Sequence, residues 1–268
     1  MPKTSFGIII PARYASSRYP GKPLVPLIGA TGEAKTLIHR SWECASNVPD
    51  CAGVWVATDD DRIAAEVHGF GGKVIMTSPD CANGTERCAD AVAGLSNVPD
   101  VIVNLQGDAP LSPGFLVNQL VDKLEADPDA VMATPVVRCS SSVYEHLVAD
   151  AAAGRVGGTT AVFSSAGRAL YFSKRVIPYL PSEGRPSPIP VYLHLGLYAY
   201  RPRALDFYNR ATASELELLE GLEQLRFLDL GLPVAVVEVD HLGWDSIELN
   251  NPSDVPAIER VLAERGIA

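Results

Sequence analysis

The 268-residue sequence predicts an α/β fold with a mostly parallel central sheet, helices on both of its faces, and an inserted hairpin region. Two observations support this fold class. Short apolar runs alternate with amphipathic helical patterns through the first half, and the first run, "FGIII", is apolar on both faces, as in a buried parallel strand. No repeat, low-complexity tract or linker composition divides the chain, so we expect one domain over residues 1–268.

The elements of the first half follow from their residues in order. Five apolar runs predict strands, at 6–10, 53–60, 73–77, 100–108 and 130–137. Helical patterns lie between them, at 37–48, 62–70, 83–95 and 112–127. Asn83, followed three residues later by Glu86, is typical of a capped helix start. Ser112 followed by Pro113 indicates another. This β-α-β-α order favours a parallel sheet.

The second half is less regular. Two strand-like segments, 159–165 and 168–174, flank Ala166-Gly167 and predict a hairpin. A further strand is expected at 191–202 and another at 233–240. Ser214 and Glu217 form a capping-box pattern for one helix that runs to Gly231. The last helix is expected to be capped by Asn251, with Pro252 in its first position.

Charge and apolar patterning exclude several classes of protein. The formal net charge of -10 argues against a binder of nucleic acid or of an anionic membrane surface, because such partners need a basic face. No apolar stretch approaches the roughly 20 residues of a membrane span. The five cysteines include no C-x-x-C pair, which disfavours a zinc site. We therefore expect a cytoplasmic protein.

A cationic loop follows the first strand. "PARYASSRYPGKPL" carries Arg13, Arg18 and Lys22 within ten residues. Ligands of open α/β sheets bind at the carboxyl ends of the strands, where this loop lies. Arginine forks and a lysine suit phosphate oxygens, Gly21 permits close backbone approach, and Ser16 adds a donor. The loop lacks both the Walker A and the G-x-G-x-x-G patterns. Its charges alone fit either a triphosphate site or a solvated surface loop.

The order of residues in this loop is more specific than its charge. It resembles the nucleotide-binding loop of the CMP-KDO synthetases (3-deoxy-manno-octulosonate cytidylyltransferases), which reads P-A-R-x-x-S-x-R-x-P-G-K-P-L. Further blocks look like that family's and occur in its order: "VATDD" (56–60), "NGTER" (83–87), "VNLQGDAP" (103–110), "ALYFSK" (169–174), "HLGLYAYR" (194–201) and "LEGLEQLR" (219–226). The resemblance covers most of the chain and implies the Rossmann-like nucleotide-diphospho-sugar transferase fold.

The resemblance implies a CTP-dependent cytidylyltransferase. It would transfer CMP from CTP to the anomeric hydroxyl of an acidic 2-keto-3-deoxy sugar, first of all 3-deoxy-D-manno-octulosonate (KDO), and release pyrophosphate. It also implies Mg²⁺ as cofactor and a homodimer. Lipopolysaccharide, capsule and natural-product pathways all stay open. One alternative is a different acceptor, such as an amino-KDO, a sialic-acid-like sugar or a phosphonate. Another is a nucleotide-binding paralogue without catalysis.

The resemblance also implies site residues. The catalytic set is Arg13, Lys22 and Asp108. The nucleotide set is Ala12, Arg13, Ser16, Arg18, Lys22, Asn83, Gly84 and Arg87. The sugar set is Gln106, His194, Tyr198, Glu223 and Gln224, and the metal set is Asp108 and Asn250. Structural roles compete for several of them: Asn83 as a helix cap, Arg87 in a salt bridge, His194 as a core histidine, Asp108 as a turn residue, and Glu223 and Gln224 on a solvated helix face.

Three positions depart from the family pattern. Asn250 stands where the family has the first Asp of Asp-x-Pro-x-Asp, a metal ligand; an amide oxygen can bind Mg²⁺ but carries no charge. Glu248 and Asp245 are nearby carboxylates that could serve instead. Thr160 takes the place of a lysine and Ser164 that of a carboxylate. These changes leave the acceptor open.

Overall fold

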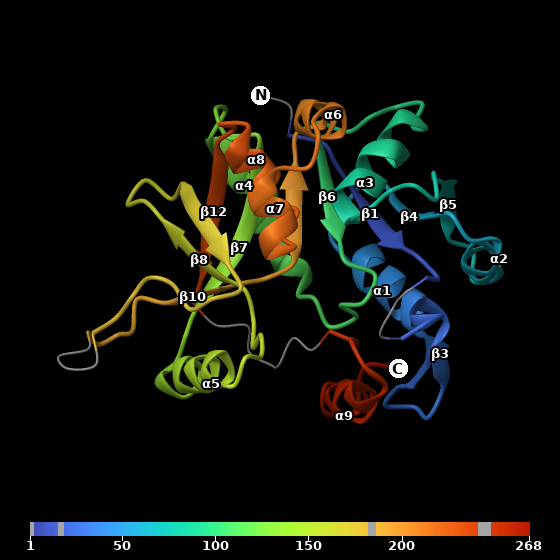
Figure 1. Cartoon of the computed structure of the whole chain (residues 1–268). Helices are drawn as coiled ribbons and strands as arrows, with labels where there is room; N and C mark the ends of the chain where they lie inside the picture. The colour runs from blue at the N-terminus through green and yellow to red at the C-terminus, as the bar shows by residue number, and fades with distance from the viewer. Residues whose placement is uncertain (1–2, 16–18, 182–185, 241–247) are drawn as a thin grey trace. The chain divides into compact units, whose positions relative to one another are not determined.

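In a computed structural model, the chain is described at residues 3–15, 19–181, 186–240 and 248–268 (Figure 1). Within these residues it forms two compact units, each assembled from separate segments of the sequence. The first unit draws on 1–118, 200–209 and 242–268, and the second on 119–199 and 210–241. The predicted single domain over 1–268 stays a prediction.

A parallel sheet forms the centre of the first unit. Its strand order is β5 (Lys73–Met76), β4 (Val54–Thr58), β1 (Phe6–Ala12) and β6 (Val101–Leu105). All three strand pairs are parallel. Ile8, Ile9 and Ile10 are fully buried on the middle strand β1. Consecutive residues of a strand point to opposite faces, so both faces of this sheet are covered, as the unbroken apolar run predicts.

Capped helices cover the sheet of the first unit. They are α1 (Leu37–Ser46), α2 (Asp61–Gly69) and α3 (Gly84–Ala93). The N-caps are Thr36, Asp60 and Asn83, and each side chain accepts a backbone N–H of its own first turn. The predicted capping role of Asn83 is confirmed, since its Oδ1 atom accepts from the Glu86 N–H at 2.9 Å. These three capping residues thus set where the helices begin.

The first unit has a second, smaller core. A hairpin of β2 (Pro26–Ile28) and β3 (Ala34–Thr36) packs with the C-terminal helix α9 (Val255–Glu264), which follows the 3-10 turn η2 (Pro252–Asp254). The apolar residues of this core include Leu27, Leu37, Leu249, Ile258 and Leu262. Helix α6 (Pro202–Arg210) belongs to this unit apart from its last residue.

The second unit carries a mixed sheet. Strand β7 (Met132–Arg138) pairs in parallel with β12 (Val234–Val239) and antiparallel with β10 (Tyr192–His194). Strand β10 pairs with β8 (Thr160–Phe163), which forms the predicted hairpin with β9 (Ala169–Ser173). Gly167 turns this hairpin with φ 70°. Helix α4 (Gly114–Ala126) leads into this unit along the chain, and α5 (Ser141–Ala152) follows β7.

Some predicted elements are divided. The strand expected at 191–202 is two strands, β10 and β11 (Leu197–Tyr200), because the chain turns at Gly196, where the Leu197 N–H donates to the Leu195 carbonyl oxygen at 2.7 Å. The helix expected from Ser214 to Gly231 is also two, α7 (Glu215–Glu220) and α8 (Leu225–Asp229). The Ser214–Glu217 capping box is confirmed, but Gly221 takes φ 60° and ends α7.

Candidate active site

The cationic loop leaves β1 at Ala12 and closes on itself. The Gly21 N–H donates to the Tyr14 carbonyl oxygen at 3.0 Å. Gly21 has φ 72°, and a Cβ there would lie 3.1 Å from the Tyr14 ring, so this position requires glycine. Lys22 follows at once and opens the 3-10 turn η1 (Lys22–Leu24). Arg13 is exposed at the base of the loop. The predicted Ser16 and Arg18 lie outside the described residues.

Lys22 and Asp108 meet although 86 residues separate them. The Lys22 Nζ atom lies 2.6 Å from the Asp108 Oδ2 atom. The two side chains are only 15% and 24% exposed. Lys22 follows β1, and Asp108 follows β6, which is parallel to β1 and adjacent to it. The carboxyl ends of both strands share one edge of the sheet, and this brings together two of the three predicted catalytic residues.

A segment near the C-terminus joins Asp108. The Leu249 N–H donates to the Asp108 carbonyl oxygen at 2.9 Å. Glu248 and Asn250 are the chain neighbours of Leu249, so this bond brings their backbone close to that of Asp108. The Asn250 Nδ2 atom donates to the Glu248 Oε2 atom at 3.4 Å. Asp245 lies outside the described residues.

These donors suit a hard cation. Mg²⁺ takes oxygen ligands and uses one or two protein carboxylates together with substrate phosphates. Asp108, Glu248 and the amide oxygen of Asn250 supply that chemistry. These oxygen donors are of the type that Mg²⁺ binds together with a phosphate ligand. Among the described residues, no group of three histidine, cysteine or acidic side chains could hold a metal by itself.

The turn at Asn83 and Gly84 faces the carboxyl end of β6. A methyl group added at Gly84 would lie 3.3 Å from the Nδ2 atom of Asn104 and 3.3 Å from the Nε2 atom of Gln106. The Asn83 Nδ2 atom donates to the Tyr208 hydroxyl at 2.9 Å. The predicted residues Asn83, Gly84 and Gln106 therefore lie together. Their roles with nucleotide and sugar stay predictions.

The Arg87 guanidinium contacts other side chains of the protein. Its Nη1 atom donates to the Thr77 hydroxyl at 2.6 Å and lies 3.1 Å from the Asp59 Oδ1 atom. The residue is 3% exposed. Of the two roles that the sequence leaves open, the structure shows the salt bridge, which ties α3 to the loop after β4. The nucleotide role of Arg87 stays a prediction.

Asn104 is a polar residue that the sequence reasoning missed. It lies on β6 with no exposed surface, and neither atom of its amide has a hydrogen-bond partner in the described part of the chain. An unpaired buried amide is costly, and such groups concentrate at functional sites. In the sequence, Asn104 is the one polar residue of the apolar run "VIVNL", and this marks it as a candidate site residue.

Four predicted sugar residues belong to the second unit. The Nε2 atom of His194 lies 2.8 Å from the Thr134 hydroxyl. The Tyr198 ring lies 5.5 Å from the His194 ring, and its hydroxyl donates to the Gln224 Oε1 atom at 3.4 Å. Gln224 is 1% exposed, and its Nε2 atom has no partner among the described residues. Glu223 precedes it in the turn between α7 and α8. Burial lowers the pKa of His194 to about 3, so the ring is neutral near pH 7.

One ion pair and one hydrogen bond hold the turn that carries Glu223 and Gln224. The Arg226 guanidinium donates to both carboxylate oxygens of Glu217, at 2.6 and 2.7 Å, and both residues are buried. Glu220 accepts from the Ser173 hydroxyl at 2.7 Å, which fixes the end of α7 to β9. The turn is thus anchored on both sides.

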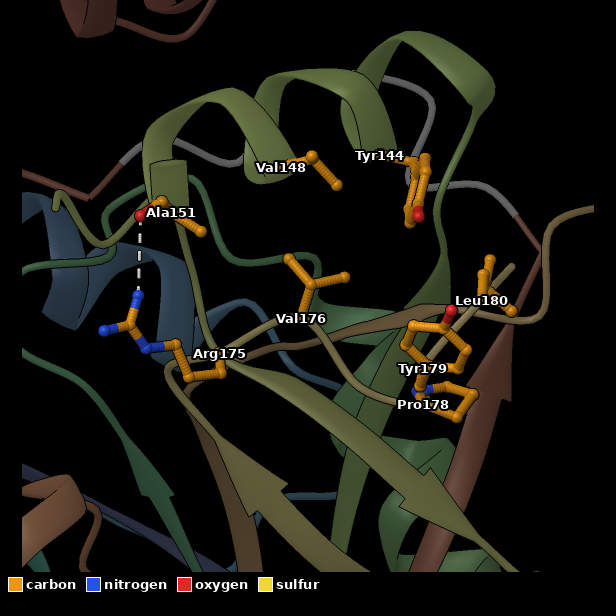
Figure 2. A pocket seen from close by; sticks show the side chains of 8 residues that line it. All are labelled: Tyr144, Val148, Ala151, Arg175, Val176, Pro178, Tyr179 and Leu180. Carbon is orange, nitrogen blue, oxygen red and sulfur yellow. Dashed lines mark hydrogen bonds between the residues drawn. The ribbon is translucent and has the colours of Figure 1, made fainter. Parts of the chain in front are cut away.

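Figure 2 shows a separate pocket of the second unit, between α5 and residues 175–180. Its volume is about 260 Å³, and its lining residues are Tyr144, Val148, Ala151, Arg175, Val176, Pro178, Tyr179 and Leu180. Arg175 is the one charged residue among them. None of the predicted site residues lines this pocket, and its chemistry does not suit a triphosphate or a sugar acid.

Comparison with known proteins defines the class first. The family model described as cytidylyltransferase matches residues 7–233. A parallel sheet with a lysine–aspartate pair at the carboxyl ends of β1 and β6 agrees with a nucleotide-binding enzyme of this kind. The chain belongs to the cytidylyltransferase family.

Individual relatives show to which group within the family the chain is similar. The chain is 43% identical over 260 residues to 3-deoxy-manno-octulosonate cytidylyltransferase of Maricaulis maris, covering 96% of this chain and 97% of the relative. It is 40% identical over 261 residues to the mitochondrial 3-deoxy-manno-octulosonate cytidylyltransferase of Arabidopsis thaliana, covering 97% and 84%. Within the cytidylyltransferases it therefore groups with the CMP-KDO synthetases, as the sequence blocks predicted.

A solved structure confirms the fold class. CMP:2-keto-3-deoxy-manno-octonic acid synthetase, in complex with CTP, matches this chain with a TM-score of 0.83 at 34% identity. The match covers 98% of this chain and 100% of that one. The predicted α/β fold with a mostly parallel sheet is thereby confirmed. Separately, no helix in the described ranges is both long and apolar enough to cross a membrane.

Proposed function

We propose that this chain transfers CMP from CTP to the anomeric hydroxyl of KDO. The hydroxyl oxygen attacks the α-phosphorus in line, the bond from that phosphorus to the bridging oxygen of the β-phosphate breaks, and pyrophosphate leaves as the hydroxyl proton is released. The Lys22–Asp108 pair at the carboxyl ends of β1 and β6 carries this proposal. The relatives named for this sugar support KDO over the other acidic acceptors.

The residues of the first unit would act on the triphosphate. Lys22 would exchange its contact with Asp108 for phosphate oxygens, and with Arg13 it would offset the negative charge that grows on the leaving group. Asn83 and Gly84 would hold the cytosine at the start of α3. Catalysis of this type depends mainly on positioning and charge neutralisation.

Mg²⁺ is the proposed cofactor. Asp108, together with Asn250 or Glu248, would hold it once Lys22 has moved to the phosphates. When bound, it supplies positive charge to phosphate oxygens. The Asn250→Asp variant tests the departure from the family pattern. We expect a lower Mg²⁺ concentration for half-maximal activity, with maximal turnover changed by less than about twofold, because a carboxylate adds charge but no new ligand position.

The residues of the second unit would bind the sugar acid. His194 and Tyr198 offer a neutral ring and a hydroxyl, and Gln224 offers an amide nitrogen that no described group occupies. Glu223 would take further hydroxyl groups. The predicted sugar role of Gln106, which belongs to the first unit, is part of the same proposal. Hydroxyl-rich ligands are selected in this way, because a buried amide or imidazole without a partner disfavours any analogue that leaves it unpaired.

The test is pyrophosphate release from CTP with Mg²⁺, in the presence and absence of KDO, with ATP, GTP and UTP as controls. We expect release only when CTP and KDO are both present. Saturable CTP binding without release would remove KDO as the acceptor and leave the nucleotide site intact. Failure to bind CTP would overturn the assignment of the loop at residues 11–23.

The homodimer and the cytoplasmic location belong to the same proposal. Both follow from the sequence and the family resemblance. The name of the Arabidopsis relative, by contrast, places that protein in mitochondria. Light scattering coupled to size exclusion measures the oligomeric state directly. A monomer at micromolar concentration would contradict the dimer and leave the proposed reaction standing.

A further inference from the structure

A buried threonine lies behind the predicted sugar histidine. Thr134 is on β7 with no exposed surface, and its hydroxyl oxygen lies 2.8 Å from the Nε2 atom of His194 on β10. The same hydroxyl oxygen lies 2.8 Å from the Leu197 carbonyl oxygen. Both contacts are within the second unit. Neither the sequence blocks nor the family resemblance assigns a role to Thr134.

The single hydroxyl proton determines the direction of both bonds. A threonine hydroxyl has one proton to donate and lone pairs to accept. The Leu197 carbonyl oxygen can only accept, and two oxygens 2.8 Å apart repel each other unless a proton lies between them. The Thr134 proton is therefore directed at the Leu197 carbonyl oxygen. His194 must then donate through Nε2 to the Thr134 hydroxyl.

This direction leaves Nδ1 as the open position of the ring. A neutral imidazole carries one proton, so a proton on Nε2 makes Nδ1 an acceptor. Phe172 and Tyr198 enclose the ring, with centroid distances of 5.0 and 5.5 Å. His194 nevertheless keeps part of its surface exposed. Among the described residues no group donates to Nδ1.

We propose that Thr134 is a positioning residue that holds His194 as the Nε2–H tautomer, so that Nδ1 accepts a hydrogen bond from a hydroxyl group of the sugar acid. The inference rests on the proposed function, which places His194 at the sugar. It also specifies what His194 distinguishes. A neutral ring with an accepting Nδ1 selects a hydroxyl donor and repels a carboxylate or carbonyl oxygen.

The tautomer is measured by long-range proton–nitrogen correlation on protein labelled with ¹⁵N-histidine. The chain has five histidines, and the spectrum of His194→Gln identifies the signals of His194 by their loss. We expect a pyrrole-type nitrogen shift at Nε2 and a pyridine-type shift at Nδ1. A pyridine-type shift at Nε2 in the wild-type protein would overturn the proposal, whatever the substrate.

Kinetics of matched variants test the function of the tautomer. Thr134→Val removes the hydroxyl at nearly constant volume, and Thr134→Ser retains it. We expect Thr134→Val to raise the KM for KDO about tenfold, the effect of about 1.4 kcal/mol, with kcat and the KM for CTP within about twofold of wild type. Thr134→Ser should keep both the tautomer and the KM.

Thr58→Val is the control for loss of a buried hydroxyl. Thr58 has no exposed surface, and its hydroxyl oxygen accepts a hydrogen bond from the Asp60 N–H at 3.3 Å within the first unit. The variant should lower stability without altering the His194 spectrum. A Thr58→Val protein whose KM for KDO rises as much as that of Thr134→Val would reduce the Thr134 effect to general destabilisation and refute the proposal.

Monodeoxy analogues of KDO complete the test. Removal of the hydroxyl that donates to Nδ1 should raise the KM in the wild-type protein and produce no further rise in Thr134→Val. Independent, additive effects of Thr134→Val and of every deoxy analogue would refute a link between them. If wild-type protein turns over no KDO, the proposed function fails, and the tautomer spectra still decide the role of Thr134.

Discussion

Separating Lys22 from Asp108 should affect stability and catalysis differently. At 2.6 Å the gross attraction of the pair is about 6 kcal/mol for an effective dielectric constant of about 20. Removing two mostly buried side chains from water offsets most of it. We expect a coupling free energy of unfolding of about 1–2 kcal/mol, between the values for exposed pairs and for fully buried ones.

The experiment is a double-mutant cycle with Lys22→Met, Asp108→Asn and their combination. Urea denaturation followed by circular dichroism gives the stability coupling. Each single variant should be less stable than wild type because one charge stays unpaired, and the double variant should regain part of the loss. Turnover should not recover. Each single change removes a group that the proposed function assigns to the phosphates or to Mg²⁺, which should cost on the order of 3 kcal/mol, more than a hundredfold in kcat.

Lys35→Met is the matched control. Lys35 forms an ion pair with Glu43 in which the Nζ and Oε1 atoms are 2.7 Å apart. Its side chain is 14% exposed, close to the 15% of Lys22. It should lose similar stability and retain turnover. Wild-type turnover in Lys22→Met or in the double variant would contradict the catalytic role proposed for Lys22. An equal loss of turnover in Lys35→Met would also refute it, since the loss would then come from destabilisation alone.

Three further predictions concern buried polar groups. Asn104→Leu should raise the free energy of unfolding by about 1–2 kcal/mol, because it removes an amide without partners; a lower melting temperature contradicts this. Burial lowers the pKa of His194 from 6.5 to about 3. Between these pH values the unfolded chain binds a proton at His194 that the folded chain does not. The free energy of unfolding is therefore unaffected by His194 protonation above pH 6.5 and declines as the pH falls toward 3. The slope reaches at most about 1.4 kcal/mol per pH unit, and His194→Gln should remove this part of the pH dependence of urea unfolding; an unchanged profile excludes it. Arg87→Met should cost roughly 3 kcal/mol, because Asp59, whose side chain is only 22% exposed, loses its cation. Lys3→Met, which breaks an exposed pair with Asp50, should cost less than about 1 kcal/mol. Equal melting temperatures of the two variants would contradict this contrast.

Local signals predicted most of the helices and strands. The Asn83 cap, the unbroken apolar run of β1 and the glycine of the β8–β9 hairpin each act within a few residues, so they can be identified before any tertiary contact is known. The predicted helix 214–231 failed at Gly221 because its pattern permits both a continuous helix and a break. Only packing decides between them, and there the anchoring of Glu220 to β9 accompanies the break.

Residue order was enough to identify the family and to predict the residue types of the site, because the loop "PARYASSRYPGKPL" is specific in its order. Which of those residues meet depends on the tertiary structure. Lys22 contacts Asp108 because parallel strands bring their carboxyl ends to one edge, and Arg87 is held by Asp59 rather than left open. The tautomer inferred for His194 depends on Thr134, 60 residues away. Hydrogen-bond partners of buried groups are set by strand pairing between distant segments, which residue order alone does not specify.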